Sequence, residues 1–192
     1  MDILANVLAA FGLSSSAGLN AYLPLLVVAL AARFTNLVQL KAPWDALESP
    51  WVIGILVILL TVEFFADKVP AVNHVNDLIQ TFIRPTAGAI LFASTTQVIT
   101  NLNPVVAIVL GLLVAGSVHV AKSAVFRPAV TATTAGLGTP VVSLMEDVTA
   151  LVISVLSVVV PVLVACILIL LTALVIWLLW RHVRATRRVA AH

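Results

Sequence analysis

Long apolar runs constrain this chain more than any other feature of its sequence. Residues 51–62, 104–120 and 148–180 are almost entirely hydrophobic, and 62% of the whole chain is hydrophobic while only 9% is charged. A soluble domain has to cover its surface with polar groups, which this composition does not supply. A run of about 20 apolar residues is long enough to cross the hydrocarbon core of a bilayer. The sequence therefore predicts an integral membrane protein.

Interruptions of the apolar pattern divide the chain into segments. We expect an all-α, polytopic transmembrane helical bundle that forms a single integral membrane domain over residues 1–192. The bundle is expected to contain broken helices. In the first segment, glycine, proline and hydroxyl residues favour a close packing seam over an unwound binding segment. In the fifth segment they favour a broken helix, which either spans the membrane or re-enters it at 131–145. The last segment would be about 50 Å long, so it tilts, kinks at Pro161 or begins outside the bilayer. About six spans are expected, near 3–32, 51–66, 85–101, 104–121, 128–145 and 148–180, before a basic tail at 181–192.

A short polar segment separates the second and third spans. Pro70 suits the first turn of a helix, and residues 71–83 then predict a short helix along the membrane interface. Its polar residues form one stripe at helical spacing and its apolar residues form the opposite one. The polar stripe consists of Asn73, Asn76, Asp77 and Gln80.

The cations predict the orientation of the spans. With six spans, eight of the ten Lys and Arg residues lie on one side, and only Arg33 and Lys41 lie on the other. Cytoplasmic loops are enriched in Lys and Arg, so both termini are predicted to be cytoplasmic. The other face would then hold Asp45, Glu48, Glu146 and Asp147.

Three segments that start from the cytoplasmic side carry a similar group of small residues. These groups are Ser16–Leu19, Thr86–Ala89 and Thr134–Leu137, and an Arg-Pro pair precedes two of them. The pattern suggests related helical hairpins whose cytoplasmic ends converge.

Several further motifs follow one another in a fixed order over most of the chain. They are Ala17–Leu26, Glu63-x3-Asp67-Lys68-x-Pro70, Arg84-Pro85-x2-Gly88-Ala89, His119-x2-Lys122 with Arg127-Pro128, and Pro140–Asp147. With them the chain resembles the bacterial membrane proteins grouped as the DUF4126 domain family. The resemblance implies a compact multi-span protein of the inner membrane, and it implies no function. The family pattern has Asp where this chain has Asn73, so a carboxylate role at that position is not carried over.

Ionisable residues are concentrated near the expected cytoplasmic boundary. One interpretation is that they anchor the helix ends, with cations reaching lipid headgroups and carboxylates pairing with them. This interpretation suits Lys68 and the C-terminal arginines best. Glu63 and His119 lie inside hydrophobic runs, where ionisable groups tend to line a cavity or pathway.

The alternative interpretation is an anion-binding pocket. Arg84 and Arg127 each precede a proline at an expected helix start, which would join a bidentate donor to the positive end of a helix dipole. The candidate substrate-binding residues are Arg84, Arg127, Lys122, Lys68 and Asn20. The candidate proton-coupling or ion-pairing residues are Glu63, Asp67, Asp77 and His119, since histidine titrates near neutral pH. The hypothesis is a small transporter or flippase-like protein for an anionic solute or lipid headgroup.

Two further functions stay open at this stage. One is a non-catalytic membrane scaffold or assembly partner that acts through small-residue helix seams, including a homo-oligomer. The other, ranked third, is a membrane enzyme acting on a lipid phosphate, for which no nucleophile–base motif is present. We expect no catalytic residue, no cofactor and no nucleic-acid partner. We also expect no metal site, because Lys68 and Arg84 already neutralise the carboxylates that could bind a metal ion. Membrane lipids are the expected surroundings.

Overall fold

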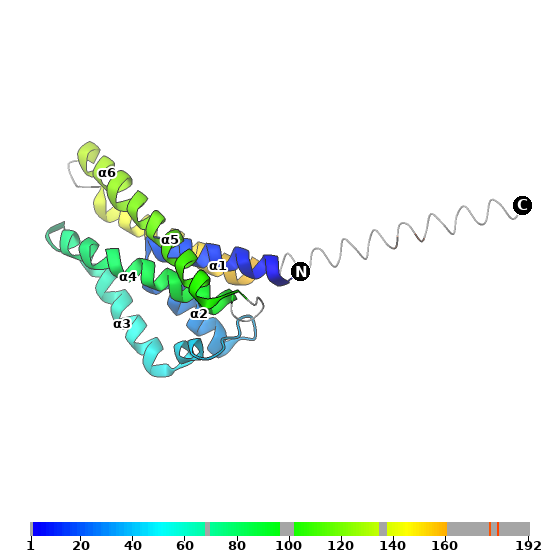
Figure 1. Ribbon diagram of the computed structural model, residues 1–192. Coiled ribbons are helices and arrows are strands. Elements are labelled where there is room, and N and C mark those ends of the chain that lie inside the picture. The colour runs from blue at the N-terminus through cyan, green and yellow to red at the C-terminus, as the bar shows by residue number, and fades with distance from the viewer. Residues whose placement is uncertain are drawn as a thin grey trace, which may run out of the picture.

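The computed structural model consists of helices and connecting loops in the residues that it describes, which are 2–67, 70–96, 102–134 and 138–160 with Trp177 and Trp180. Figure 1 shows the order of the helices. They are α1 (Asp2–Leu19), α2 (Tyr22–Phe34), the 3₁₀ helix η1 (Trp44–Glu48), α3 (Pro50–Ala66), α4 (Pro70–Thr96), α5 (Pro104–Ala121), the π-helix η2 (Lys122–Phe126), α6 (Arg127–Thr134) and an unlabelled helix at Thr139–Val160.

Helix α1 is the centre of the packing. Ser14 Oγ donates to the carbonyl of Gly88 on α4, and the rings of Phe11 and Phe92 meet edge to face, so α1 and α4 run antiparallel. Ser16 Oγ donates to the carbonyl of Ala150, which places the helix Thr139–Val160 on another side of α1. Helix α5 packs against both α1 and α4.

Small residues allow α4 and α5 to pack closely. A Cβ atom added to Gly88 would lie 2.8 Å from the carbonyl oxygen of Gly111, and one added to Gly111 would lie 2.6 Å from Ala89 Cα. Real Cβ atoms do not approach backbone atoms so closely. The close seam brings the polar residues of α4 within reach of His119 on α5.

The first apolar segment differs from the single broken span expected at 3–32. It folds into two separate helices, α1 and α2, with the break at Asn20 and Ala21. The side chain of Asn20 accepts hydrogen bonds from the backbone N–H groups of Tyr22 and Leu23, at 3.1 and 3.0 Å. The break therefore results from an asparagine that satisfies the start of α2, not from the glycines before it.

Helix α4 also differs from the sequence expectation. An interfacial helix at 71–83 and a separate span from residue 85 were predicted, but α4 continues from Pro70 to Thr96 through Pro85. A proline inside a helix removes one backbone donor, and neighbouring helices make this tolerable in apolar surroundings. Arg84, just before Pro85, contacts Glu63 on α3 and His119 on α5 from within this continuous helix.

The last helices also begin and end at other residues than the expected spans. No turn separates residues 121 and 128, because α5 continues through η2 directly into α6. The next helix begins at Thr139, so Glu146 and Asp147, which were expected in a loop on the outer face, lie inside it. Most of residues 161–180 and the basic tail at 181–192 lie outside the described part of the chain.

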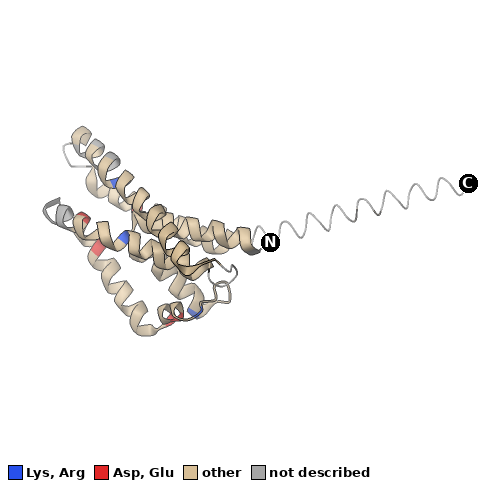
Figure 2. Cartoon of the chain, viewed as in Figure 1, with Lys and Arg blue, Asp and Glu red and all other residues tan. Residues whose placement is uncertain are grey.

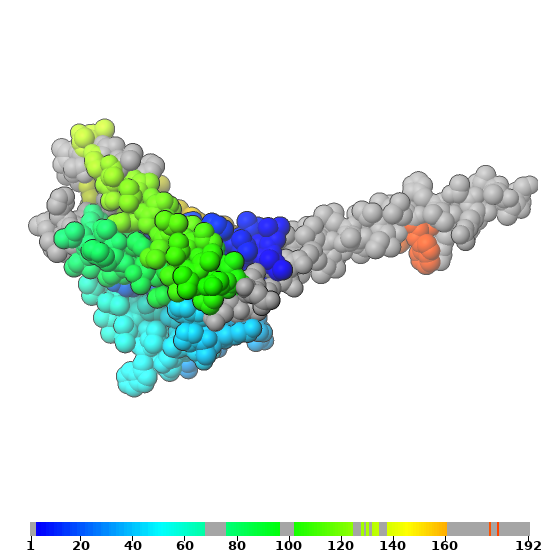
Figure 3. Space-filling view, viewed as in Figure 1, coloured from blue at the N-terminus to red at the C-terminus, as the bar shows by residue number. Residues whose placement is uncertain are grey.

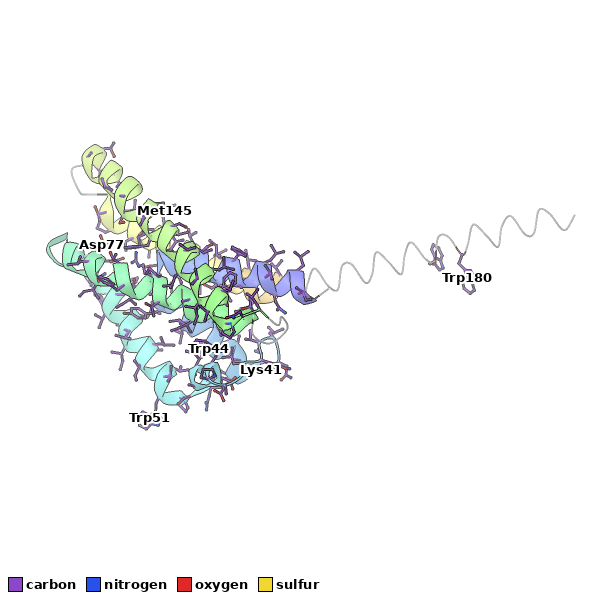
Figure 4. All side chains as sticks on the ribbon, viewed as in Figure 1. Lys41, Trp44, Trp51, Asp77, Met145 and Trp180 are labelled. Carbon is purple, nitrogen blue, oxygen red and sulfur yellow. The ribbon has the colours of Figure 1, made fainter. Side chains whose placement is uncertain are left out.

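Large apolar side chains cover the outside of the described helices. Trp51 at the start of α3 is 83% exposed and points away from the bundle (Figure 4), and Ile58, Phe65, Val105 and Leu113 are also exposed. Figure 3 shows the helices as space-filling layers against one another. Two described helices, Pro104–Ala124 and Thr139–Val160, are long and apolar enough to cross a membrane. The six-span arrangement stays a prediction.

Candidate functional site

Arg84 is the centre of a buried group of charged side chains. It lies in the middle of α4 with none of its surface exposed, and its Nη2 atom is 2.9 Å from Glu63 Oε1 on α3. The same Nη2 atom is 3.8 Å from Asp67 Oδ2 at the end of α3. Glu63 is itself only 2% exposed. A single guanidinium group therefore faces two carboxylates, one turn apart on α3.

His119 binds the other side of the guanidinium. Arg84 Nη1 is 3.2 Å from His119 Nδ1, and since arginine can only donate, Nδ1 is the acceptor. His119 Nε2 is 3.1 Å from Thr81 Oγ1, whose own hydrogen goes to the carbonyl of Asp77 at 2.8 Å. Nε2 must then carry the proton and donate to Thr81. Both hydrogen bonds describe the same neutral tautomer of His119.

The polar stripe of α4 completes this arrangement. Asn76 Nδ2 donates to Asp67 Oδ1 at 2.6 Å, and the buried Gln80 hydrogen-bonds to the Tyr22 hydroxyl on α2. Asn76 and Gln80 were predicted to share a face, and they lie on the face that carries Arg84. We call Glu63, Asp67, Asn76, Gln80, Thr81, Arg84 and His119 the Arg84 cluster.

Three buried polar atoms of the Arg84 cluster make no hydrogen bond within the described residues. They are Glu63 Oε2, Gln80 Oε1 and Arg84 Nε. A buried polar atom without a partner costs about 1–3 kcal/mol, and such atoms are rare in folded proteins. Arg84 contacts Glu63 and lies one helical turn after Gln80, so three side chains of this cluster each keep one atom that can take a further hydrogen-bonding partner.

A second polar group lies where α1 ends. Lys122 is 3% exposed, and its Nζ donates to the carbonyl of Leu19 and pairs with Glu146 Oε2, both at 2.8 Å. Asn20 Nδ2 donates to Asp147 Oδ1 at 3.0 Å. We call Asn20, Lys122, Glu146 and Asp147, with the Leu19 carbonyl, the Lys122 cluster. It joins α1, α2, the end of α5 and the helix Thr139–Val160.

The structure separates the predicted site residues into three sets. Arg84, Glu63, Asp67 and His119 come together in the Arg84 cluster, and Lys122 and Asn20 belong to the Lys122 cluster. Asp77 is partly buried and lies near the beginning of α4 (Figure 4). Lys68 and the side chain of Arg127 lie outside the described residues. Figure 2 shows how few charged residues the helices carry outside these groups and the region around η1.

The helix-dipole argument for the two arginines is wrong. Arg84 lies inside α4, and Arg127 opens α6 directly after η2, so neither residue precedes a free helix N-terminus. An anion at Arg84 would therefore be bound by side chains alone.

The comparison with protein families decides how the chain is classified. A family model described as a domain of unknown function, DUF4126, matches residues 7–181. The chain belongs to this family. Curated proteins and solved structures give no match. For this DUF4126 chain the argument about function therefore depends on the two clusters.

Several residues of these clusters had no signal in the sequence. Thr81 was not singled out, and Glu146 and Asp147 were placed between two spans. Their partners are distant in the chain, with 127 positions between Asn20 and Asp147. Within the described residues, no group of three or more His, Cys, Asp or Glu side chains is arranged to hold a metal ion.

Proposed function

We propose that this DUF4126 chain is a small membrane transporter or flippase-like protein that binds an anionic solute or lipid headgroup at Arg84. The observation that supports the proposal best is a completely buried guanidinium whose described partners are all side chains. Such partners can rotate away without breaking a helix. A planar arginine donor also suits carboxylate and phosphate oxygens better than a lysine does.

Burial of the site agrees with transport more than with simple surface binding. Since Arg84 has no exposed surface, an anion reaches it only when the helices around it separate, and the described conformation is then the closed one. Helices α3, α4 and α5 supply the site, and α3 makes few contacts with the bundle compared with α4 and α5. Movement of α3, which carries both Glu63 and Asp67, would open the guanidinium.

The apolar exterior supports a membrane location. Exposed Trp51, Ile58, Phe65 and Leu113 would be costly in water, whereas lipid tails accommodate them. We place the protein in the bacterial inner membrane with the Lys122 end of α5 on the cytoplasmic side, as the distribution of cations predicts. Because α1 runs antiparallel to α4 and ends at Lys122, the beginning of α1 then lies at the opposite face, contrary to the cytoplasmic N-terminus expected from six spans.

Mass spectrometry of molecules that co-purify in mild detergent tests the proposal. The wild type should retain an anionic lipid or metabolite that is absent from the Arg84→Gln variant. Arg33→Gln is the matched control, because Arg33 is exposed and its described hydrogen bond goes to the carbonyl of Glu48. Identical profiles for all three proteins would refute anion binding at Arg84, and the assembly-partner function would be tested next.

A further inference from the structure

The Arg84 guanidinium is already neutralised within the Arg84 cluster. Its Nη2 atom pairs with the Glu63 carboxylate and also approaches Asp67, and its Nη1 atom donates to His119, whose hydrogen bonds describe a neutral imidazole. The Glu63 carboxylate therefore already balances the positive charge of Arg84. A second anion entering this arrangement would be repelled unless a carboxylate loses its charge or moves away. Anion binding thus requires a compensating positive charge.

His119 is a poor place for that charge. Its Nδ1 lone pair accepts the Arg84 hydrogen bond, and its Nε2 hydrogen is donated to Thr81. If a proton were added to His119 Nδ1, this nitrogen and Arg84 Nη1 would both be donors, and both groups would be positively charged. The guanidinium that binds the anion would then be repelled from its position.

Glu63, unlike His119, has an atom that can bind a proton without losing a hydrogen bond. Its Oε1 atom holds Arg84, while its Oε2 atom makes no hydrogen bond within the described residues and is buried. A proton can bond to Oε2 without displacing an existing partner. It also removes the carboxylate charge that competes with an incoming anion for Arg84 Nη2.

The charged and titratable groups that face Glu63 do not change the assignment of the proton to Glu63. Arg84 on α4, Asp67 on α3 itself, Lys122 at the end of α5 and the Tyr22 hydroxyl on α2 face it electrostatically, and His119 faces it through Arg84. Lys122 already pairs with Glu146, and Asp67 already accepts from Asn76. Among the described residues, Arg84 has no backbone partner that would hold it apart from Glu63.

We propose that Glu63 carries the coupling proton: an oxyanion replaces the Glu63 carboxylate on Arg84 as a proton from water binds Glu63 Oε2. The contact between Arg84 Nη2 and Glu63 Oε1 breaks, and an oxygen of the oxyanion accepts the same Nη2 hydrogen. One proton and one negative charge enter, so the charge of the site is unchanged. This inference rests on the proposed function. His119 is a positioning residue that keeps Arg84 in place during the exchange.

The oxyanion is a carboxylate or phosphate, since it takes the place of a carboxylate. Two probes distinguish its source: inorganic phosphate added to protein in phosphatidylcholine nanodiscs, and nanodiscs in which part of the lipid is phosphatidic acid. A soluble ligand responds to the first probe, and a lipid headgroup responds only to the second. The proton should accompany either one.

Binding measured against pH is the first test. For the wild type, the apparent affinity for the responding probe should rise by about tenfold for each unit that the pH falls, over the range where free Glu63 is ionised, because one proton binds with one anion. Glu63→Gln should lose this dependence and keep only the variation that the ionisation of the phosphate probe itself produces. Glu63→Asp should restore the dependence, and His119→Gln should weaken binding while keeping the dependence.

Infrared difference spectroscopy supplies a second test, and its first measurement uses the wild type alone. Adding the probe should produce the carbonyl band of a protonated carboxyl group, and this band should be absent from Glu63→Gln. If Asp67→Asn or His119→Gln removes the pH dependence instead, the proton belongs elsewhere and the inference is wrong. Binding of the probe without any pH dependence or carboxyl band would also overturn it, while the proposed function would stand. Binding of neither probe would overturn both.

Discussion

The two buried clusters use the same kinds of side chain for different purposes. In the Lys122 cluster, Lys122 and Asn20 satisfy backbone groups at the broken junction of α1 and α2. In the Arg84 cluster, the contacts of Arg84 run from side chain to side chain, and three buried polar atoms have no described partner. Polar groups that hold the backbone cannot leave without disrupting the fold. Groups that hold only each other can exchange partners.

Single charge removals should have the largest effects, and they should be similar in the two clusters. Arg84→Gln leaves Glu63 as an uncompensated buried charge, and Lys122→Met does the same to Glu146. Each should lower the free energy of unfolding by about 3–5 kcal/mol. Unfolding midpoints in detergent measure this, with the exposed Arg33→Gln as the control.

Removing both charges of an ion pair should change the stability of the protein differently in the two clusters. Glu63→Gln with Arg84→Gln should recover most of the lost stability, because the Glu63 charge is removed with its partner and the buried Asp67 keeps the hydrogen bond from Asn76. Lys122→Met with Glu146→Gln should stay about 1–3 kcal/mol below the wild type, because the Leu19 carbonyl has lost its donor. Equal recovery of the two double variants would contradict the distinction between them.

The glycine seam that places His119 against α4 can be tested separately. Gly88→Ala brings a methyl group against Ala115 and the Gly111 carbonyl, and it should cost about 1–3 kcal/mol of stability. Gly54→Ala on α3 meets nothing within 4 Å and should instead stabilise by about 0.5–1 kcal/mol. A destabilised Gly54→Ala variant would mean that this face of α3 is covered in the folded protein.

Loss of the helix cap should give the smallest effect. Asn20→Ala removes the acceptor for the first N–H groups of α2, and it should cost about 0.5–2 kcal/mol. Asn103→Ala is the matched comparison, because Asn103 caps the exposed start of α5 through Val105. Chemical unfolding should show a larger loss of stability for Asn20→Ala than for Asn103→Ala, because Asn20 is buried. A larger loss for Asn103→Ala would argue against a structural role for Asn20.

The sequence predicted the helical class and much of the residue content of the Arg84 cluster. The spacing of Asn76 and Gln80 placed them on one helix face, and Glu63 and Asp67 are one turn apart in the same way. These relations are local, so helical geometry alone supplies them.

The sequence misled where distant contacts decide the structure. The Arg84-Pro85 pair resembles a helix start, but ion pairing across α3 and α4 holds it inside a continuous helix. Glu146 and Asp147 resemble a polar loop, but Lys122 and Asn20 pair with them inside the helix Thr139–Val160. Local patterns contain no information about which residues of another helix will neutralise a charge.

Flux of inorganic phosphate into phosphatidylcholine vesicles tests the central claim most directly, with phosphatidic acid flipping measured in parallel for the lipid alternative. The variant to compare is Glu63→Gln with Arg84→Gln, because it should remain folded while lacking the guanidinium. We predict that the wild type moves one of the two probes faster than protein-free vesicles do, and that the double variant moves neither. Equal rates for the wild type and the double variant would contradict anion transport through the Arg84 cluster.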